Sequence, residues 1–99
     1  MTWSKRLLFI VGRGCGNCKC MKSVVFGPDN TSGITKDYPD VQFVEMDKDD
    51  EHEFGKPVFE HFAITTIPTL IYMVDNIEVG RISGLRPASF VKKVLDGQN

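Results

Sequence analysis

The sequence has few cysteines, and they are confined to one short stretch. All three cysteines lie between Cys15 and Cys20, and the rest of the 99-residue chain holds none. A small secreted domain stapled by disulfides spreads its cysteines along the chain, so the sequence excludes that architecture. The cluster instead indicates redox chemistry or metal binding, and we expect the reducing cytoplasm as the compartment.

Long hydrophobic segments are also missing. A membrane-spanning helix needs about 20 consecutive apolar residues, and a secretory signal needs an apolar stretch of roughly 7–15 residues. The apolar run nearest the N-terminus covers only residues 7–11 and stops at Gly12. We therefore expect no membrane partner and no secretory signal.

The chain has no excess of charge of either sign. Twelve basic side chains stand against 13 acidic ones, which gives a net charge of −1. A nucleic-acid partner is therefore not expected. The hydrophobic fraction of 41% is ordinary for a globular fold. The length suits one domain over residues 1–99, which we expect to act as a monomer.

Hydrophobic periodicity predicts an α/β domain. A helix joins the first two predicted strands, so they should be parallel, whereas Asp75-Asn76 between the last two predicts an antiparallel hairpin. The expected order is β-α-β-α-β-β-α, with a four-stranded mixed central sheet flanked by helices. Strands are expected at residues 7–11, 41–47, 69–74 and 77–83, and helices after residue 15, at 58–62 and from residue 87.

The same periodicity assigns side chains to the core. The core-facing residues expected on the two longer helices are Cys18, Met21, Val24 and Val25 on the first, and Phe90, Val91, Val94 and Leu95 on the last. Met46 and Met73 fall in strand patterns and are also expected in the core. The polar segment 30–40 is expected to be a loop with one short helical turn.

Cys15 and Cys18 follow a buried strand directly and open a helix. The first turn of a helix carries unpaired N–H groups and the positive end of the helix dipole. At such a position a cysteine pKa falls from about 8.5 to about 3.5–7.5. We therefore predict that Cys15 attacks a disulfide and that the less exposed Cys18 resolves the mixed disulfide. Gly16 and Asn17 allow the tight turn and leave Cys15 uncovered.

Three features, in this order, resemble the thioredoxin family. They are the segment Cys15-Gly16-Asn17-Cys18-Lys19 after a buried strand, Thr66-Ile67-Pro68-Thr69 before the hairpin, and Gly84 between the last strand and the last helix. The resemblance implies a thioredoxin-like fold and a protein dithiol-disulfide oxidoreductase. It implies disulfide-containing protein substrates, a thiol reductant or reductase as electron donor, and no cofactor or metal.

The resemblance also implies a substrate site around the cysteine pair. In the family, the proline that matches Pro68 is cis and faces the cysteines, and the residue before it, here Ile67, offers its backbone to the substrate chain. Gly84 matches a glycine that leaves room for substrate. The expected substrate-binding residues are Gly14, Gly16, Asn17, Ile67, Pro68 and Gly84.

The sequence departs from the family at several positions. Few residues precede the first strand, so we expect a trimmed core of glutaredoxin size without the leading strand and helix. The segment 83–87 lacks the glycine pair and acidic pair with which glutaredoxins bind glutathione. Gly14 stands where the family has tryptophan, and Asn17 stands where it has proline.

The family's buried charge pair is also replaced. Its aspartate, which assists proton transfer at the resolving thiol, falls on Phe9, and its lysine neighbour falls on Phe43. The double replacement is coherent, because an unpaired buried charge is costly. Cys18 then has no obvious base in the protein, and resolution relies either on water or on Glu45, which shares a strand face with Phe43.

Two other functions compete with the enzyme. One is a redox-inert thioredoxin-like module that only binds a partner protein, and the other is metal carriage by the cysteine cluster. Cys20 lies about 200° around the helix from Cys18, so these two thiols do not easily converge on one ion. We expect Cys20 to be a partly buried helix residue and His52 and His61 to lie at the surface.

Overall fold

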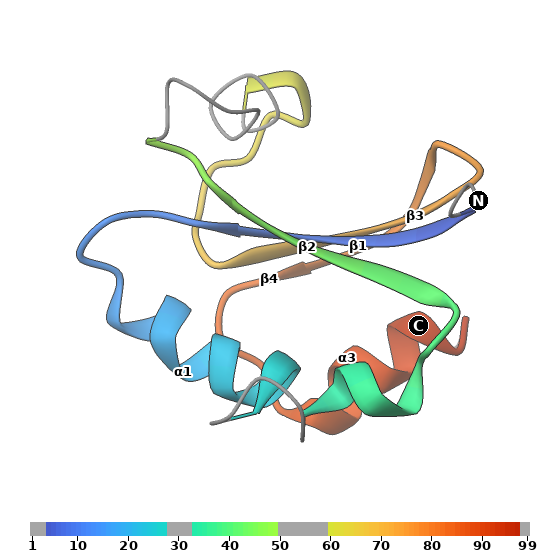
Figure 1. Cartoon of the computed structure of the whole chain (residues 1–99). Helices are drawn as coiled ribbons and strands as arrows, with labels where there is room; N and C mark the ends of the chain where they lie inside the picture. Colours follow the sequence, from blue (N-terminus) through green and yellow to red (C-terminus); the bar gives the residue numbers. More distant parts are fainter. Residues whose placement is uncertain (1–3, 28–32, 50–59, 98–99) are drawn as a thin grey trace.

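The computed structural model describes residues 4–27, 33–49 and 60–97 (Figure 1). Its sheet has the strand order β2-β1-β3-β4. β1 pairs in parallel with β2, and the pairs β1·β3 and β3·β4 are antiparallel. The elements are β1 (Lys5–Val11), α1 (Gly16–Phe26), the 3-10 turn η1 (Ile34–Asp37), β2 (Val41–Asp47), β3 (Thr69–Val74), β4 (Ile77–Ser83) and α3 (Ala88–Leu95).

This architecture confirms the predicted four-stranded mixed sheet and the two longer helices. The short helical turn expected in segment 30–40 is η1. The first two residues of the helix expected at 58–62 lie outside the described residues, and the structure shows only a helical turn at residues 60–61. Within the described part of the chain, no helix is both long enough and apolar enough to cross a membrane.

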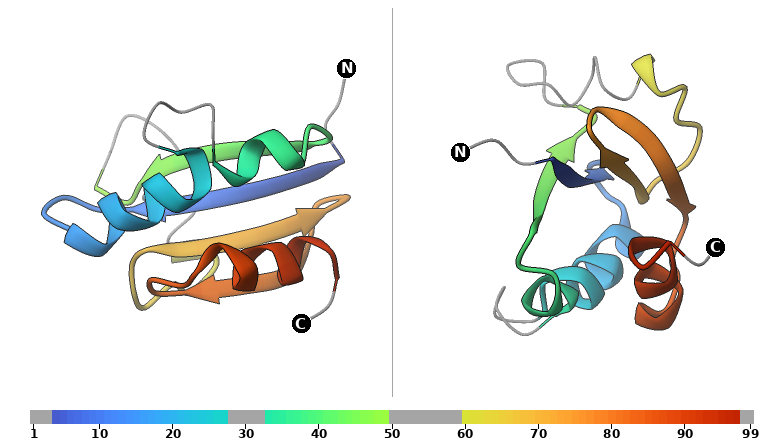
Figure 2. Two further views of the ribbon diagram at one scale, coloured as in Figure 1. Left: turned by 90° about the horizontal axis from the view of Figure 1, so that it is seen from below. Right: turned by 90° about the vertical axis from the view of Figure 1, so that its right-hand side faces the viewer.

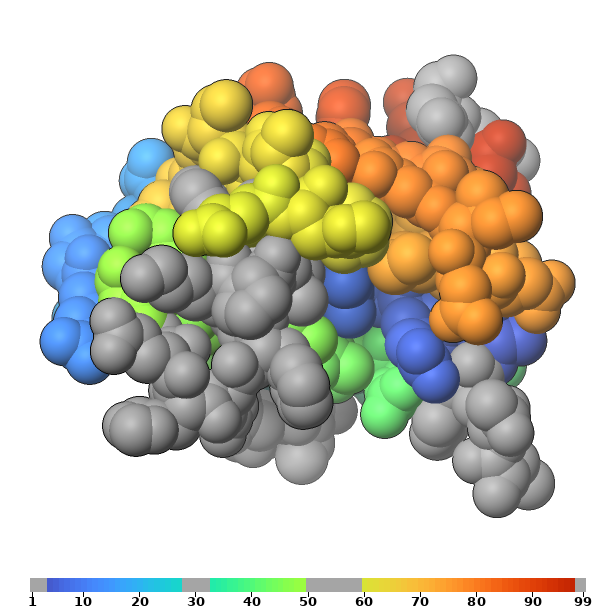
Figure 3. All heavy atoms as spheres, turned by 90° about the horizontal axis from the view of Figure 1, so that it is seen from above, coloured from blue at the N-terminus to red at the C-terminus, as the bar shows by residue number. Residues whose placement is uncertain are grey.

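The helices lie on one face of the sheet. α1, η1 and α3 cover the same side (Figures 1 and 2), and the turn at residues 60–63 lies on the opposite side, next to the β3–β4 hairpin of the sheet (Figure 3). β1 is central and is buried on both faces, as its continuous apolar run predicts. Leu7 and Phe9 belong to the core beneath the helices, and Leu8 and Ile10 belong to the core on the other face.

The chain reverses sharply between β3 and β4. Asp75 and Asn76 have φ values of 52° and 68°. Both values lie in the left-handed region that a two-residue type I′ hairpin turn requires, and Asp and Asn tolerate that region better than most residues. The predicted hairpin is therefore confirmed, and it places the end of β4 beside the beginning of β3.

The prediction for Phe90 was wrong. Its side chain is 43% exposed, whereas Val91, Val94 and Leu95 of the same helix are buried. Phe90 lies in the first turn of α3, at the edge of the helix face formed by these buried residues. The guanidinium of Arg86 stacks on its ring instead, 5.6 Å from the ring centroid.

Met46 and Met73 are partly buried and pack against the core cluster on the sheet face opposite the helices. That cluster also contains Ile64 and Ile71. Tertiary packing therefore agrees with the strand pattern for both methionines, although neither is fully enclosed.

Tyr38, which follows η1, ties that turn to α3. Its phenol donates a hydrogen bond of 2.8 Å to Asp96 Oδ1. Partial burial, reinforced by the hydrogen bond and by the negative charge of Asp96, raises the pKa of Tyr38 to about 12. The neutral phenol is favoured because a phenolate beside the Asp96 carboxylate would bring two anions together.

Tyr38→Phe is expected to lower the free energy of unfolding by about 0.5–1 kcal/mol at neutral pH, because one partly exposed hydrogen bond is lost and the ring remains. The tyrosine pKa of about 10 in an unfolded chain is raised on folding, so this contribution is complete below about pH 10. It disappears as the pH rises toward about 12. Denaturant unfolding of both proteins at stepwise alkaline pH measures the difference. A difference in free energy of unfolding that stays constant over this pH range would contradict a stabilising hydrogen bond from Tyr38 to Asp96.

Candidate active site

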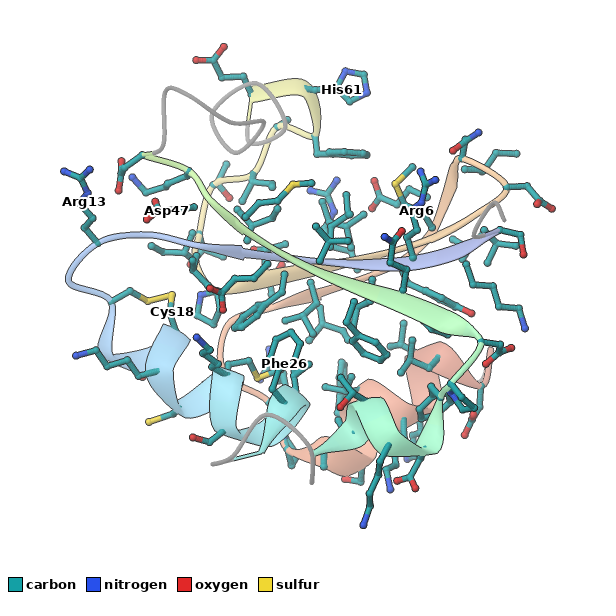
Figure 4. The ribbon with its side chains drawn as sticks, viewed as in Figure 1. Arg6, Arg13, Cys18, Phe26, Asp47 and His61 are labelled. Atoms are coloured by element: carbon teal, nitrogen blue, oxygen red, sulfur yellow. A yellow bond between two sulfur atoms is a disulfide. The ribbon has the colours of Figure 1, made fainter. Side chains whose placement is uncertain are left out.

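The cysteine pair lies where β1 ends and α1 begins (Figure 4). Cys15 is the N-cap of α1, with extended backbone angles, and its Sγ accepts a hydrogen bond of 3.1 Å from the backbone N–H of Cys18. A disulfide joins the two residues, whose Cα atoms are 5.2 Å apart. The sulfur of Cys15 therefore occupies the position in which a helix N-terminus stabilises negative charge.

The two cysteines differ in exposure. Cys18 is 5% exposed, and Cys15 is only partly buried. The Cys15 side is therefore the more accessible of the two to another molecule. Cys18 is shielded within the first turn of the helix, from which it can reach only its neighbour. This asymmetry is the geometric requirement for one attacking thiol and one resolving thiol.

The register of β1 against β3 brings a distant loop next to the cysteines. Ile10 pairs with Thr69, so residues that precede β3 lie beside residues that follow β1. The peptide bond between Ile67 and Pro68 is cis, and Pro68 is buried. Thr69 Oγ1 donates a hydrogen bond of 2.6 Å to the carbonyl of Thr66, which closes this loop locally.

Gly12 is a site residue that the sequence patterns did not identify. An added Cβ atom at Gly12 would lie 2.7 Å from Cδ1 of Ile67. The missing side chain therefore allows Ile67 to pack against the chain that leads from β1 to the cysteines. The only signal in the sequence is a glycine directly after a buried strand, which a turn explains equally well.

Gly84 joins the site from the end of β4. Its N–H donates a hydrogen bond of 2.8 Å to the carbonyl of Pro68, and its φ is 80°. Space around its Cα is open, because an added Cβ would meet no heavy atom within 4 Å. The left-handed φ explains why glycine occupies this position.

The remaining predicted site residues surround Cys15. Gly14 is exposed and has a φ of 69°, which again suits glycine, and Gly16 and Asn17 are exposed in the first turn of α1. The structure therefore gathers Gly14, Gly16 and Asn17 at one end of the sheet together with Gly84 and the cis-proline loop. Their contacts with a substrate stay a prediction.

An apolar rim follows Gly84. Leu85 and Phe90 are each 43% exposed, and Arg86 lies over the Phe90 ring. Exposed large apolar side chains mark candidate contact surfaces. Phe90 was not expected at this surface, because helical periodicity alone assigns it to the core.

A cleft of about 260 Å³ opens beside the disulfide. Cys15 and Cys18 line it together with Lys22 of α1 and Glu45 of β2. Lys22 Nζ lies 3.4 Å from Glu45 Oε1, so an ion pair bridges the helix and the strand at the cleft. Lys22 was not identified from the sequence, because a single lysine in a helix has no distinguishing pattern.

Aromatic packing fills the space behind the site. Phe9 is completely buried, its ring centroid lies 6.0 Å from that of Phe26, and Phe26 lies 6.3 Å from Phe43. Phe26 lies between α1 and the sheet (Figure 4). These contacts account for the apolar residues at positions 9 and 43.

Cys20 lies apart from the redox pair. It is a free, exposed cysteine, so the expectation that it is partly buried was wrong. The segment of α1 that carries it faces solvent on the side away from the sheet. Among residues 4–27, 33–49 and 60–97, no group of three or more His, Cys, Asp or Glu side chains could hold a metal ion. The geometry gives metal carriage no support.

His61 is exposed, as expected, and its ring packs edge-on against Phe62 with centroids 4.8 Å apart. It lies on the sheet face opposite the helices, away from the cysteine pair (Figure 4). His52, also expected at the surface, lies outside the described residues. The described histidine therefore takes no part in the candidate site.

Comparisons with known proteins agree with this geometry. A sequence model described as thioredoxin matches residues 6–96 of the chain. Mitochondrial thioredoxin-3 of Saccharomyces cerevisiae is 29% identical over 82 residues, which are 83% of this chain and 57% of that protein. This chain therefore spans little more than half the length of that curated relative.

Solved structures of thioredoxins match over nearly the whole chain. The oxidised form of mitochondrial thioredoxin 3 from Saccharomyces cerevisiae is 28% identical with a TM-score of 0.74, and the match covers 94% of this chain and 78% of that one. The thioredoxin NaTrxh of Nicotiana alata is 26% identical with a TM-score of 0.75, and the match covers 99% and 76% of the two chains.

Proposed function

The chain belongs to the thioredoxin family, and we propose on this basis that it is a thiol–disulfide oxidoreductase that reduces disulfides in other proteins. The observation that carries the proposal is the unequal pair at the start of α1. Cys15 caps the helix and is accessible, and Cys18 donates its N–H to the Cys15 sulfur while its own side chain is buried. Binding alone would not need two thiols in this arrangement.

The reaction consists of two exchanges. The Cys15 thiolate attacks one sulfur of a substrate disulfide, and the other substrate sulfur leaves as a thiolate. The Cys18 thiolate then attacks Cys15 Sγ and releases the second substrate thiolate. Two electrons pass from the dithiol to the substrate, and the chain is left with the Cys15–Cys18 disulfide seen in the structure. A reductase or a small thiol then restores the dithiol.

The substrate in this proposal is an extended protein segment. It lies along the backbone of Ile67 and crosses Gly84, where the open space leaves room for a second chain. The exposed side chains of Leu85 and Phe90 add an apolar contact beyond the disulfide. The apolar rim favours a protein substrate over glutathione. A monomer in the reducing cytoplasm, expected from the sequence, stays a prediction.

The test is insulin reduction with dithiothreitol as electron donor. The protein is expected to accelerate the reaction by about tenfold or more over dithiothreitol alone, because a lowered thiol pKa raises the thiolate fraction at neutral pH by about that factor. Cys20→Ser should retain this activity, because Cys20 is exposed and outside the site. Binding of the substrate without acceleration would favour the redox-inert module.

A further inference from the structure

Resolution requires the buried Cys18 thiol to lose its proton. Only the thiolate attacks a disulfide, and a free cysteine with a pKa of about 8.5 is a few per cent ionised at neutral pH. Cys18 is 5% exposed, so bulk solvent has little access to its sulfur. Val11 and Phe9, on the β1 segment that leads to the site, carry no group that accepts a proton.

The cleft beside the disulfide contains one group suited to this task. Of the side chains that line the cleft, only the Glu45 carboxylate can accept a proton at neutral pH. The others are one valine, two glycines, the two cysteines and three cations. The cleft volume of about 260 Å³ has room for several water molecules, each of which occupies about 30 Å³ in the liquid.

Two elements hold Glu45 at this cleft. In the sheet, Glu45 of β2 is the register partner of Phe9, so its side chain points to the face covered by α1. Lys22 lies one helical turn after Cys18, on the same side of α1. Its ammonium lies 3.4 Å from the Glu45 carboxylate and joins the helix to the strand.

The charges around Glu45 come from three elements. α1 contributes Lys19 and Lys22, and the turn after β1 contributes Arg13, all of which line the cleft. β2 itself contributes Asp47, whose carboxylate accepts a hydrogen bond of 2.8 Å from the backbone N–H of Asp49. Three cations therefore line the cleft together with the single carboxylate of Glu45.

We propose that Glu45 is the proton acceptor for Cys18 during resolution, and that Lys22 positions its carboxylate. This inference rests on the proposed function. As Cys18 Sγ bonds to Cys15 Sγ, the Cys18 proton passes through cleft water to Glu45, and the bond between Cys15 and the substrate sulfur breaks. The electron pair of that bond leaves with the substrate thiolate. Glu45 then returns the proton to solvent through the open mouth of the cleft.

The reaction of the reduced protein with 5,5′-dithiobis(2-nitrobenzoate) separates the two steps. Attack by Cys15 releases one thionitrobenzoate, and resolution by Cys18 releases the second. A Cys20→Ser background removes the exposed thiol that would also react. In this background, Glu45→Gln is expected to slow the second release by about tenfold or more near neutral pH and to leave the first unchanged. The difference should shrink as the pH rises through the pKa of the Cys18 thiol, because the thiol then ionises without a protein base.

Two matched variants separate proton transfer from structure. Glu45→Asp keeps a carboxylate and should restore part of the rate, and Lys22→Gln keeps Glu45 and should slow the second release less than Glu45→Gln does. If Glu45→Gln and its parent release the second thionitrobenzoate at equal rates, the proposal is overturned. It is also overturned if Glu45→Gln slows this release by the same factor at every pH. If the parent releases no second thionitrobenzoate, the proposed function itself fails.

Discussion

Cys15→Ser is expected to abolish insulin reduction and return the rate to that of dithiothreitol alone. A serine hydroxyl does not ionise at neutral pH, so the helix N-terminus that favours a thiolate at this position has no nucleophile to stabilise. The fold should be retained, because Cys15 is only partly buried and serine is a preferred N-cap residue. Insulin turbidity and far-UV circular dichroism measure the two outcomes.

Cys18→Ser provides the complementary result. Cys15 keeps its position at the helix N-terminus and still attacks a disulfide, but the mixed disulfide persists because no second thiol displaces it. Non-reducing electrophoresis and intact mass should show a covalent adduct that dithiothreitol releases. Cys20→Ser is the control that should show no adduct. An active Cys15→Ser protein, or an adduct that survives in the Cys15→Ser/Cys18→Ser double variant, would contradict the assigned roles.

Phe9→Asp is expected to cause the largest loss of stability. Phe9 is fully buried between the sheet and α1, and truncating such a side chain costs about 3–5 kcal/mol. The introduced carboxyl adds the cost of burying a polar group without a partner. Its register partner on β2 is Glu45, so two acidic groups would meet. We therefore expect a loss of about 4 kcal/mol or more at neutral pH.

The pH dependence of this loss has a definite sign. Burial raises the pKa of the introduced carboxyl above its unfolded value of about 3.9, so the variant is least destabilised in acid, where the group is neutral in both states. The loss relative to the parent should increase as the pH rises through the raised pKa. Thermal unfolding of both proteins at stepwise pH measures this loss of stability. A loss that does not change with pH would contradict burial of the charge.

Two further variants separate the causes of the stability loss in Phe9→Asp. Phe9→Leu keeps an apolar side chain, so it should lower the free energy of unfolding less than Phe9→Asp does. The leucine requires only repacking of the core, whereas the aspartate also buries a carboxyl group. Phe43 shares the sheet face of Phe9, two positions from its register partner, and contacts the same Phe26 ring. Phe9→Asp combined with Phe43→Lys should therefore recover part of the loss in a double-mutant cycle. The absence of coupling would show that the two positions do not interact.

The local sequence was sufficient for features that depend on neighbouring residues. Apolar runs located the strands, and Asp75-Asn76 located the hairpin, because these residues accept the left-handed backbone of the turn. The positions of Cys15 and Cys18 also followed from local structure, since a helix N-terminus and one helical turn separate a partly buried thiol from a buried one. Their roles as attacking and resolving thiols stay a prediction. The predicted substrate contacts at Ile67 and Gly84 rest on family resemblance and await a test.

Only the tertiary structure decided which distant residues meet. The approach of Ile67 to Gly12 depends on the register of β1 and β3, and the pairing of Lys22 with Glu45 depends on how α1 docks on β2. Helical periodicity placed Phe90 in the core, yet it is exposed because the sheet covers only part of the apolar face of α3. Periodicity describes the faces of one element. Contacts between elements depend on strand register and helix docking, which the global packing of the chain determines.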